Sequence, residues 1–209
     1  MITSARDPSV GNPFCTRHVR PGRLLSLDAT GRPVDLAPLV SKLAAAGISA
    51  AVVGPHGSGK TTLLGHLADA LEARCERVIR MRVGRARDAV KLLGAVAGAR
   101  PGGIICVDGW ERLGVAWAFV VRQSASAAGV RLLVTAHRAG PLPTLWECTT
   151  TPALLEAIVA SLPGGGCGSI QEADVQEAFR AASGDIREAL FLLYDTFEAR
   201  ARTARQASA

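Results

Sequence analysis

A glycine-rich loop carries the strongest chemical signal in the sequence. Residues 54–61 read Gly-Pro-His-Gly-Ser-Gly-Lys-Thr and match the pattern G-x-x-x-x-G-K-[ST] in full. An apolar run at residues 48–54 predicts a buried strand before the loop, and a helical pattern starts at Lys60. Glycines let consecutive backbone N–H groups turn toward one anion, and the positive end of the helix dipole points at the same place. The loop therefore predicts a phosphate-binding site.

The polar residues of this loop have distinct expected roles. The Lys60 ammonium would reach the β- and γ-phosphates of a nucleotide, and the Thr61 hydroxyl would ligate Mg²⁺. Thr62 would support the α-phosphate. His56 occupies a variable position of the pattern, so we interpret it as loop filler rather than a catalytic group. The residues expected to contact nucleotide in the loop are Gly54, Pro55, His56, Gly57, Ser58, Gly59, Lys60, Thr61 and Thr62.

A carboxylate ends a second apolar run, residues 103–108, which reads Gly-Ile-Ile-Cys-Val-Asp. Asp108 lies 48 positions after Lys60, a spacing that fits a strand next to the phosphate-loop strand. We expect Asp108 to hold Mg²⁺, mostly through water. The alternative is a carboxylate that caps the following helix.

The residues after Asp108 bear on water activation. Glu111 is the nearest carboxylate downstream and is a candidate general base for an attacking water. An acid placed in the first turn of a helix, where the dipole favours it, is the equal alternative. We expect Trp110 to pack rather than to contact nucleotide. Arg112 and Arg122 follow as candidates for action on a neighbouring subunit's phosphate, and the sequence selects neither.

Polar residues also follow the apolar run at 130–136. Open parallel sheets bind ligands beyond the carboxyl ends of their strands. Thr135 is therefore expected to sense a terminal phosphate or to orient water, with His137 and Arg138 close by. The alternative is a polar cluster at a strand end that binds nothing.

Strand and helix patterns alternate from residue 36 to residue 150, with expected strands at 48–54, 77–83, 103–108, 130–136 and 144–150. This alternation predicts an α/β fold, a doubly wound, parallel five-stranded P-loop core with helices on both faces of the sheet. After residue 151 only helical patterns remain, and the first is capped by Thr151 with Pro152 at its first position. We expect four segments: an N-terminal arm (1–35), the P-loop core (36–150), a small C-terminal helical lid (151–200) and a basic tail that frays (201–209).

The combination of the loop, the acidic strand and Thr135 on an intervening strand resembles the additional-strand class of P-loop ATPases. The segment Ser183-Gly-Asp-Ile-Arg187-Glu-Ala-Leu190 resembles the sensor 2 segment of AAA+ ATPases, in which a helical lid places an arginine over the bound phosphates. The resemblance covers residues 36–198. It implies ATP and Mg²⁺ as ligands and Arg187 as the phosphate-contacting residue of the lid.

The resemblance also bears on the segment before the core. In several AAA+ proteins, residues before the first helix line the adenine pocket, which implies that Phe14 or Val19 touches the base. An apolar N-terminal anchor is the equal alternative.

The sequence departs from the family pattern in two places. Many related ATPases carry Glu directly after the strand-ending Asp, where this sequence has Gly109. Only five residues, 139–143, separate Arg138 from the fifth expected strand, where AAA+ proteins typically carry a helix that ends in an arginine finger. The segment Asp108-Gly-Trp-Glu111 also resembles the D-G-h-D pattern of NACHT and other STAND signalling ATPases, with Glu as the second acid.

Composition bears on partners and location. The chain has 24 basic and 18 acidic residues, a net charge of +6, and 21 of the basic residues are arginine. This excess fits either a GC-rich genome or phosphate and nucleic-acid recognition. Arginines around the expected second strand form either a solvated sheet edge or a partner surface. The N-terminus shows no apolar signal-peptide core, no run is long enough to span a membrane, and the five scattered cysteines suggest neither disulfides nor zinc. We expect a cytoplasmic protein.

Together, these features predict a Mg²⁺-dependent ATP-binding protein, an ATP hydrolase that couples nucleotide state to lid movement and to a protein partner. One alternative is a nucleotide-dependent switch or scaffold with little turnover, which Gly109 favours. The other is a DNA-linked ATPase, which the net charge permits.

Overall fold

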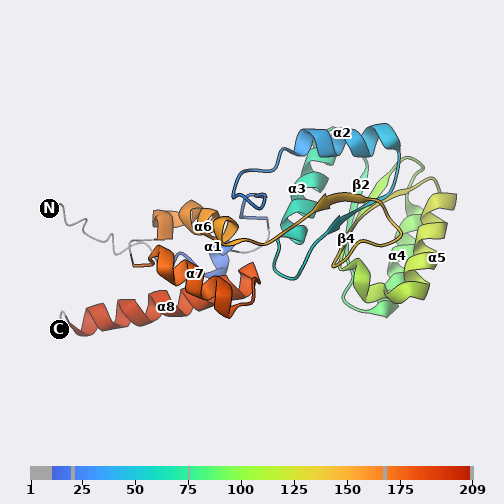
Figure 1. The fold of residues 1–209 in the computed structure, drawn as a ribbon. Helices are drawn as coiled ribbons and strands as arrows, with labels where there is room; N and C mark the ends of the chain where they lie inside the picture. Colours follow the sequence, from blue (N-terminus) through green and yellow to red (C-terminus); the bar gives the residue numbers. More distant parts are fainter. Residues whose placement is uncertain (1–10, 20–21, 75, 167–168, 208–209) are drawn as a thin grey trace. The chain divides into compact units, whose positions relative to one another are not determined.

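The computed structural model describes residues 11–19, 22–74, 76–166 and 169–207. The chain divides into two compact units. Residues 33–149 form the sheet unit, and the described residues up to Arg32 together with those from Thr150 onward form the helical unit. Residues before the expected core therefore pack with the C-terminal helices (Figure 1).

The sheet unit is built on five parallel strands in the order β2-β3-β4-β1-β5. The strands are β1 (Ala50–Val53), β2 (Val78–Arg82), β3 (Ile104–Asp108), β4 (Arg131–Ala136) and β5 (Thr144–Glu147). The parallel five-stranded α/β fold predicted from the sequence is confirmed. The three inner strands consist almost wholly of buried residues, because helices cover both faces of a doubly wound sheet.

The order of the strands corrects one expectation. The 48-residue spacing between Lys60 and Asp108 fitted neighbouring strands, but β3 does not pair with β1. β4 lies between them and pairs with both. In register, Val52 of β1 lies opposite Thr135 of β4, and Arg82 of β2 lies opposite Asp108 of β3. The carboxyl ends of β1, β2, β3 and β4 therefore lie at the same end of the sheet.

Helices cover both faces of the sheet (Figure 1), and an apolar cluster of side chains fills the space on each face. The first cluster joins the sheet to α4 and α5 through side chains such as Leu92 and Val121. The second joins it to α2 and α3 through Leu43 and Leu67. The helices are α2 (Leu36–Ala46), α3 (Lys60–Ala73), α4 (Ala89–Gly98) and α5 (Gly114–Ala127), with 3₁₀ turns η1 (Ala86–Asp88) and η2 (Trp110–Leu113).

The helical unit has a core of its own. It contains α1 (Thr16–Val19), α6 (Pro152–Ser161), α7 (Glu172–Ala181), α8 (Ile186–Gln206) and the 3₁₀ turn η3 (Pro163–Gly166). Phe14 is 1% exposed in this core and meets Phe197 edge-on, with ring centroids 6.4 Å apart. The Thr151 hydroxyl caps α6 as expected, accepting from the Leu154 N–H. α8 runs on to Gln206, so residues 201–206, expected as a frayed tail, are helical.

Within the described part of the chain, no helix is both long enough and apolar enough to cross a membrane.

We predict that Leu193→Ala destabilises the protein by about 2–5 kcal/mol, because a buried leucine side chain is removed and a cavity is left. Leu193 is 0% exposed in the helical unit. Leu25→Ala in the same unit is the matched control; Leu25 is 62% exposed, so its change should stay within about 0.5 kcal/mol. Urea unfolding followed by circular dichroism measures both. Equal losses for the two variants would contradict the assignment of this core.

Candidate functional site

The loop between β1 and α3 needs glycine where its backbone turns. Gly57 and Gly59 have φ values of 67° and 82°, in the left-handed region that residues with a side chain rarely adopt. A Cβ at Gly54 would lie 2.3 Å from the carbonyl oxygen of Cys148. Gly59 is also the N-cap of α3 and offers no side-chain acceptor to the first turn. The positive end of the α3 dipole therefore points at this loop without a side-chain cap from Gly59, which favours an anion there.

The Lys60 side chain lies back along the loop. Its ammonium donates to the carbonyl oxygen of Gly54 at 2.8 Å and to that of Pro55, and the residue is 9% exposed. Ser58 donates from its hydroxyl to the same Pro55 oxygen at 2.8 Å. A buried cation is costly unless polar groups surround it, and loop carbonyls meet that need here. The loop thus holds one positive charge at its centre.

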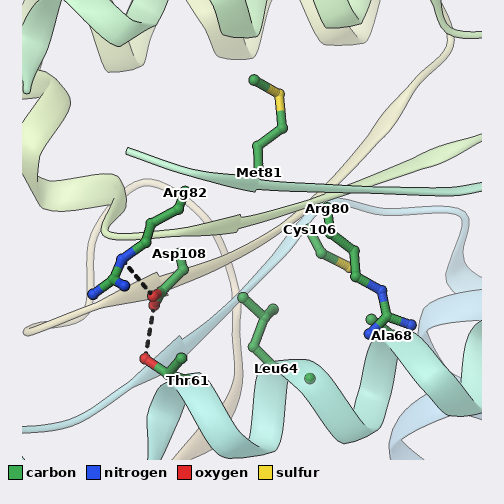
Figure 2. A pocket seen from close by; sticks show the side chains of 9 residues that line it. Thr61, Leu64, Ala68, Arg80, Met81, Arg82, Cys106 and Asp108 are labelled. Atoms are coloured by element: carbon green, nitrogen blue, oxygen red, sulfur yellow. Dashed lines mark hydrogen bonds and ion pairs between the residues drawn. The ribbon is translucent and has the colours of Figure 1, made fainter. Parts of the chain in front are cut away.

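The Asp108 carboxylate joins three elements of the sheet unit. Its Oδ1 accepts hydrogen bonds from the hydroxyls of Thr61 on α3 and Thr135 on β4, each at 2.9 Å. Its Oδ2 lies 3.7 Å from Nε of Arg82, on β2. Figure 2 shows Thr61 and Arg82 pointing at Asp108. The three residues line a hollow of about 250 Å³ between α3, β2 and β3.

Thr135 is 2% exposed, and its hydroxyl makes two hydrogen bonds. It donates to Asp108 and accepts from the backbone N–H of Gly109 at 2.9 Å. The sequence predicted that Thr135 senses a phosphate or orients water. The structure adds a contact that the sequence did not predict, in which Thr135 fixes the orientation of the Asp108 carboxylate.

Gly109 occupies the position at which the family resemblance places a glutamate. Its φ is 82°, and a Cβ there would lie 2.6 Å from the carbonyl oxygen of Val83. A side chain at this position would clash with the backbone of the next strand's end, so the chain must use glycine. The η2 turn that follows buries Trp110 in the core, as expected, and turns Glu111 outward.

Glu111 meets one of two stacked histidines at this edge of the sheet. Its Oε1 lies 3.1 Å from Nε2 of His137, which follows β4. The His137 ring packs on the ring of His56 from the glycine-rich loop, with centroids 3.9 Å apart. Sequence reasoning missed this cluster because it took His56 for loop filler. The available signal was a histidine at each of two strand ends that the sheet brings together.

The residues present fit a nucleotide phosphate with Mg²⁺. The Thr61 hydroxyl and the Asp108 carboxylate offer neighbouring oxygens, the ligand type that Mg²⁺ prefers. No cluster of three His, Cys, Asp or Glu side chains suited to a metal occurs among the described residues. Mg²⁺ takes one or two protein ligands and completes its shell with phosphate oxygens and water, so the Thr61–Asp108 pair offers enough oxygens for it.

Solved structures of two proteins share this architecture. A point variant of RuvB from Thermotoga maritima is similar with a TM-score of 0.51 and 19% identity, over 76% of this chain and 58% of RuvB. The replication initiator DnaA, in a structure bound to AMPPCP and single-stranded DNA, is similar with a TM-score of 0.52 and 13% identity, over 81% of this chain and 63% of DnaA. The chain has the fold of AAA+ ATPases.

This chain spans less than two thirds of the length of either structure. No protein-family model and no curated protein sequence matches it. The AAA+ likeness therefore rests on the fold, and the role of each residue rests on the contacts described here.

Two residues expected at the site belong to the helical unit of the AAA+-like fold. Phe14 is buried in the helical core, which is the anchor position that the sequence allowed beside contact with the base. Arg187 lies exposed in the first turn of α8, whose N-cap Asp185 accepts from the Arg187 N–H at 2.9 Å.

Residues 137–143 connect β4 to β5 without a helix, as the short spacing between Arg138 and the fifth expected strand predicted.

One arginine of the expected sheet edge pairs with acidic residues. β2 is an edge strand, and its Arg80 forms ion pairs with Asp69 at 2.7 Å and Glu72 at 2.8 Å on α3.

Burial raises the pKa of Cys106 to about 12 and that of Cys148 to about 11. Both thiols are therefore neutral at neutral pH and are not thiolate nucleophiles.

We predict that Gly109→Ala destabilises the protein more than Gly47→Ala does. Both glycines are left-handed, with φ of 82° and 58°, which costs an alanine about 1–2 kcal/mol. A Cβ at Gly47 would meet nothing within 4 Å, whereas at Gly109 it would meet Val83. Urea unfolding measures the difference, and equal losses would show that the close approach at Gly109 is absent.

Proposed function

We propose that this protein binds ATP with Mg²⁺ and hydrolyses it to ADP and phosphate. The observation that carries the proposal is the meeting of the Lys60 ammonium, the first turn of α3 and the Thr61–Asp108 pair at one edge of the sheet. These groups supply positive charge and oxygen ligands where a nucleotide's terminal phosphates would lie. The AAA+-like fold supports the choice of ATP.

Each residue of the site has a separate role in the proposed ATP hydrolysis. Lys60 leaves its loop carbonyls for the terminal phosphates and stabilises the charge that spreads over them. Thr61 and Asp108 would hold Mg²⁺, Asp108 mostly through water, and the ion would supply positive charge beside the phosphate oxygens. Glu111 orients a water and accepts its proton. The water oxygen bonds to the γ-phosphorus, the bond to the β,γ-bridging oxygen breaks, and ADP keeps that electron pair.

The helical unit would respond to the nucleotide through Arg187. The resemblance to sensor 2 segments supports a contact between this exposed guanidinium and the terminal phosphate. Such a contact is made with ATP and lost with ADP, so it would couple nucleotide state to the helical unit and to a protein partner.

A second candidate function is a nucleotide-dependent switch with little turnover. Gly109 favours it, because the position that carries the water-activating carboxylate in many related ATPases cannot accept a side chain here. A DNA-linked ATPase is a variant of the first proposal, supported by the net charge of +6 and by the DNA-bound state of the similar DnaA structure.

We predict that Lys60→Ala weakens ATP binding at least about tenfold, because the central positive charge is lost. Glu111→Gln should keep binding but lower kcat about 10²–10⁴-fold, because an amide cannot accept the proton. Fluorescent-nucleotide titration and phosphate release measure the two effects, each with and without single-stranded DNA. Glu177→Gln, an exposed change in the helical unit, is the control.

Three outcomes would redirect this proposal. ATP binding by the wild type without phosphate release would favour the switch. Full activity of Glu111→Gln would remove Glu111 as the base. Stimulation by DNA would favour the DNA-linked ATPase.

We also predict that Thr135→Val lowers the apparent Mg²⁺ affinity of the ATP complex about 10- to 100-fold, because Asp108 loses a hydrogen bond that orients it. Thr135→Ser keeps the hydroxyl and should stay near wild type. Mg²⁺ titrations of nucleotide binding measure both variants. An unchanged Mg²⁺ affinity in Thr135→Val would show that Thr135 does not orient the metal ligand.

A further inference from the structure

A stacked imidazole pair, His56 in the phosphate loop and His137 after β4, has no role in the function proposed above. His56 and His137 come from the ends of two neighbouring strands, β1 and β4, and their ring planes are tilted by 39° at a centroid distance of 3.9 Å. His137 also reaches Glu111 on the η2 turn at 3.1 Å. Three separate segments of the sheet unit therefore meet through these side chains.

We propose that His137 is the positioning residue for Glu111 and that His56 holds the His137 ring in place. The proposal rests on the proposed hydrolysis and deepens it, because it says what orients the base. The Nε2 atom of His137 faces a carboxylate oxygen, so Nε2 carries the proton and donates it. Oε1 of Glu111 is thereby fixed, and Oε2 is the oxygen that turns to the attacking water.

The other nitrogen of His137 strengthens this assignment. Nδ1 is buried and has no hydrogen-bond partner within the described residues. Leaving a polar atom unpaired is unfavourable, and a phenyl ring would fill the same space without that penalty. The imidazole is therefore explained by the contact of its Nε2 with the Glu111 carboxylate rather than by packing.

The stack on His56 explains how the ring keeps its direction. Glu111 and His137 are each about 30% exposed at the side chain, so water competes for their bond. A ring packed against His137 limits rotation about its χ angles and preserves the Nε2 direction. Because His56 lies in the phosphate loop, a change of the loop on binding nucleotide would reach Glu111 through two side-chain contacts.

The kinetic test uses variants that separate shape from hydrogen bonding. His137→Phe keeps a ring on His56 but loses the Nε2 donor; we expect kcat to fall about 10- to 100-fold with little change in KM, because Glu111 loses its alignment. His137→Gln, whose amide can donate, should recover part of the loss. His56→Ala should lose part of kcat, and His56→Phe, which keeps a ring on His137, should lose less.

A double variant asks whether His137 acts through Glu111. In the Glu111→Gln background the base is already gone, so adding His137→Phe should lower kcat little further. Multiplied effects, or a His137→Phe variant with wild-type kcat, would overturn the proposal.

A spectroscopic test does not depend on turnover. Long-range ¹H–¹⁵N correlation spectra of histidine-labelled protein report which ring nitrogen of His137 carries the proton. We expect the Nε2–H tautomer in wild type and a changed His137 signal in Glu111→Ala. The Nδ1–H tautomer, or a signal unaffected by Glu111→Ala, would overturn the inference. If wild type releases no phosphate but these spectra agree, the hydrolysis fails while the His137–Glu111 pairing stands.

Discussion

The hydrogen bonds of one carboxylate hold the edge of the sheet together. The Asp108 carboxylate accepts hydrogen bonds from the hydroxyls of Thr61 and Thr135, and the Thr135 hydroxyl accepts one from the Gly109 N–H. These bonds tie the first turn of α3 to the ends of β3 and β4. The Thr61 side chain and the turn after Asp108 are therefore both held through the same carboxylate. The chemistry proposed at this edge depends on that shared acceptor.

The same turn explains why the candidate base stands three residues beyond Asp108. Gly109 passes too close to Val83 for any side chain, so a carboxylate at that position is sterically excluded. The η2 turn then presents Glu111 on the outside while Trp110 fills the core. A base on a short 3₁₀ turn has fewer neighbours to fix it than one at a strand end. Contact with His137 supplies that support in the proposed mechanism.

Local patterns were enough to predict the strands, the phosphate loop and the helix cap at Thr151, because each depends on residues near in sequence. The strand order needed more, since the spacing of Asp108 from Lys60 alone suggested a neighbouring strand. Only the family resemblance placed β4 between β1 and β3. The His56–His137 contact escaped prediction because it depends on loop shape and on the pairing of β1 with β4. The length of α8 was missed because a basic composition does not by itself end a helix.

The helical unit is made from segments that lie on both sides of the sheet unit in the sequence, and this has a consequence for folding. Residues on both sides of the sheet unit, including Phe14 near one end and Leu193 near the other, share one apolar core. The sheet unit is thus an insertion within the helical unit, and the backbone crosses between them twice, near residues 32–33 and 149–150. The helical core can therefore form only when segments from both sides of the sheet unit are present. The sheet unit needs no segment from outside residues 33–149, so its core can form before the last helices of the chain are made.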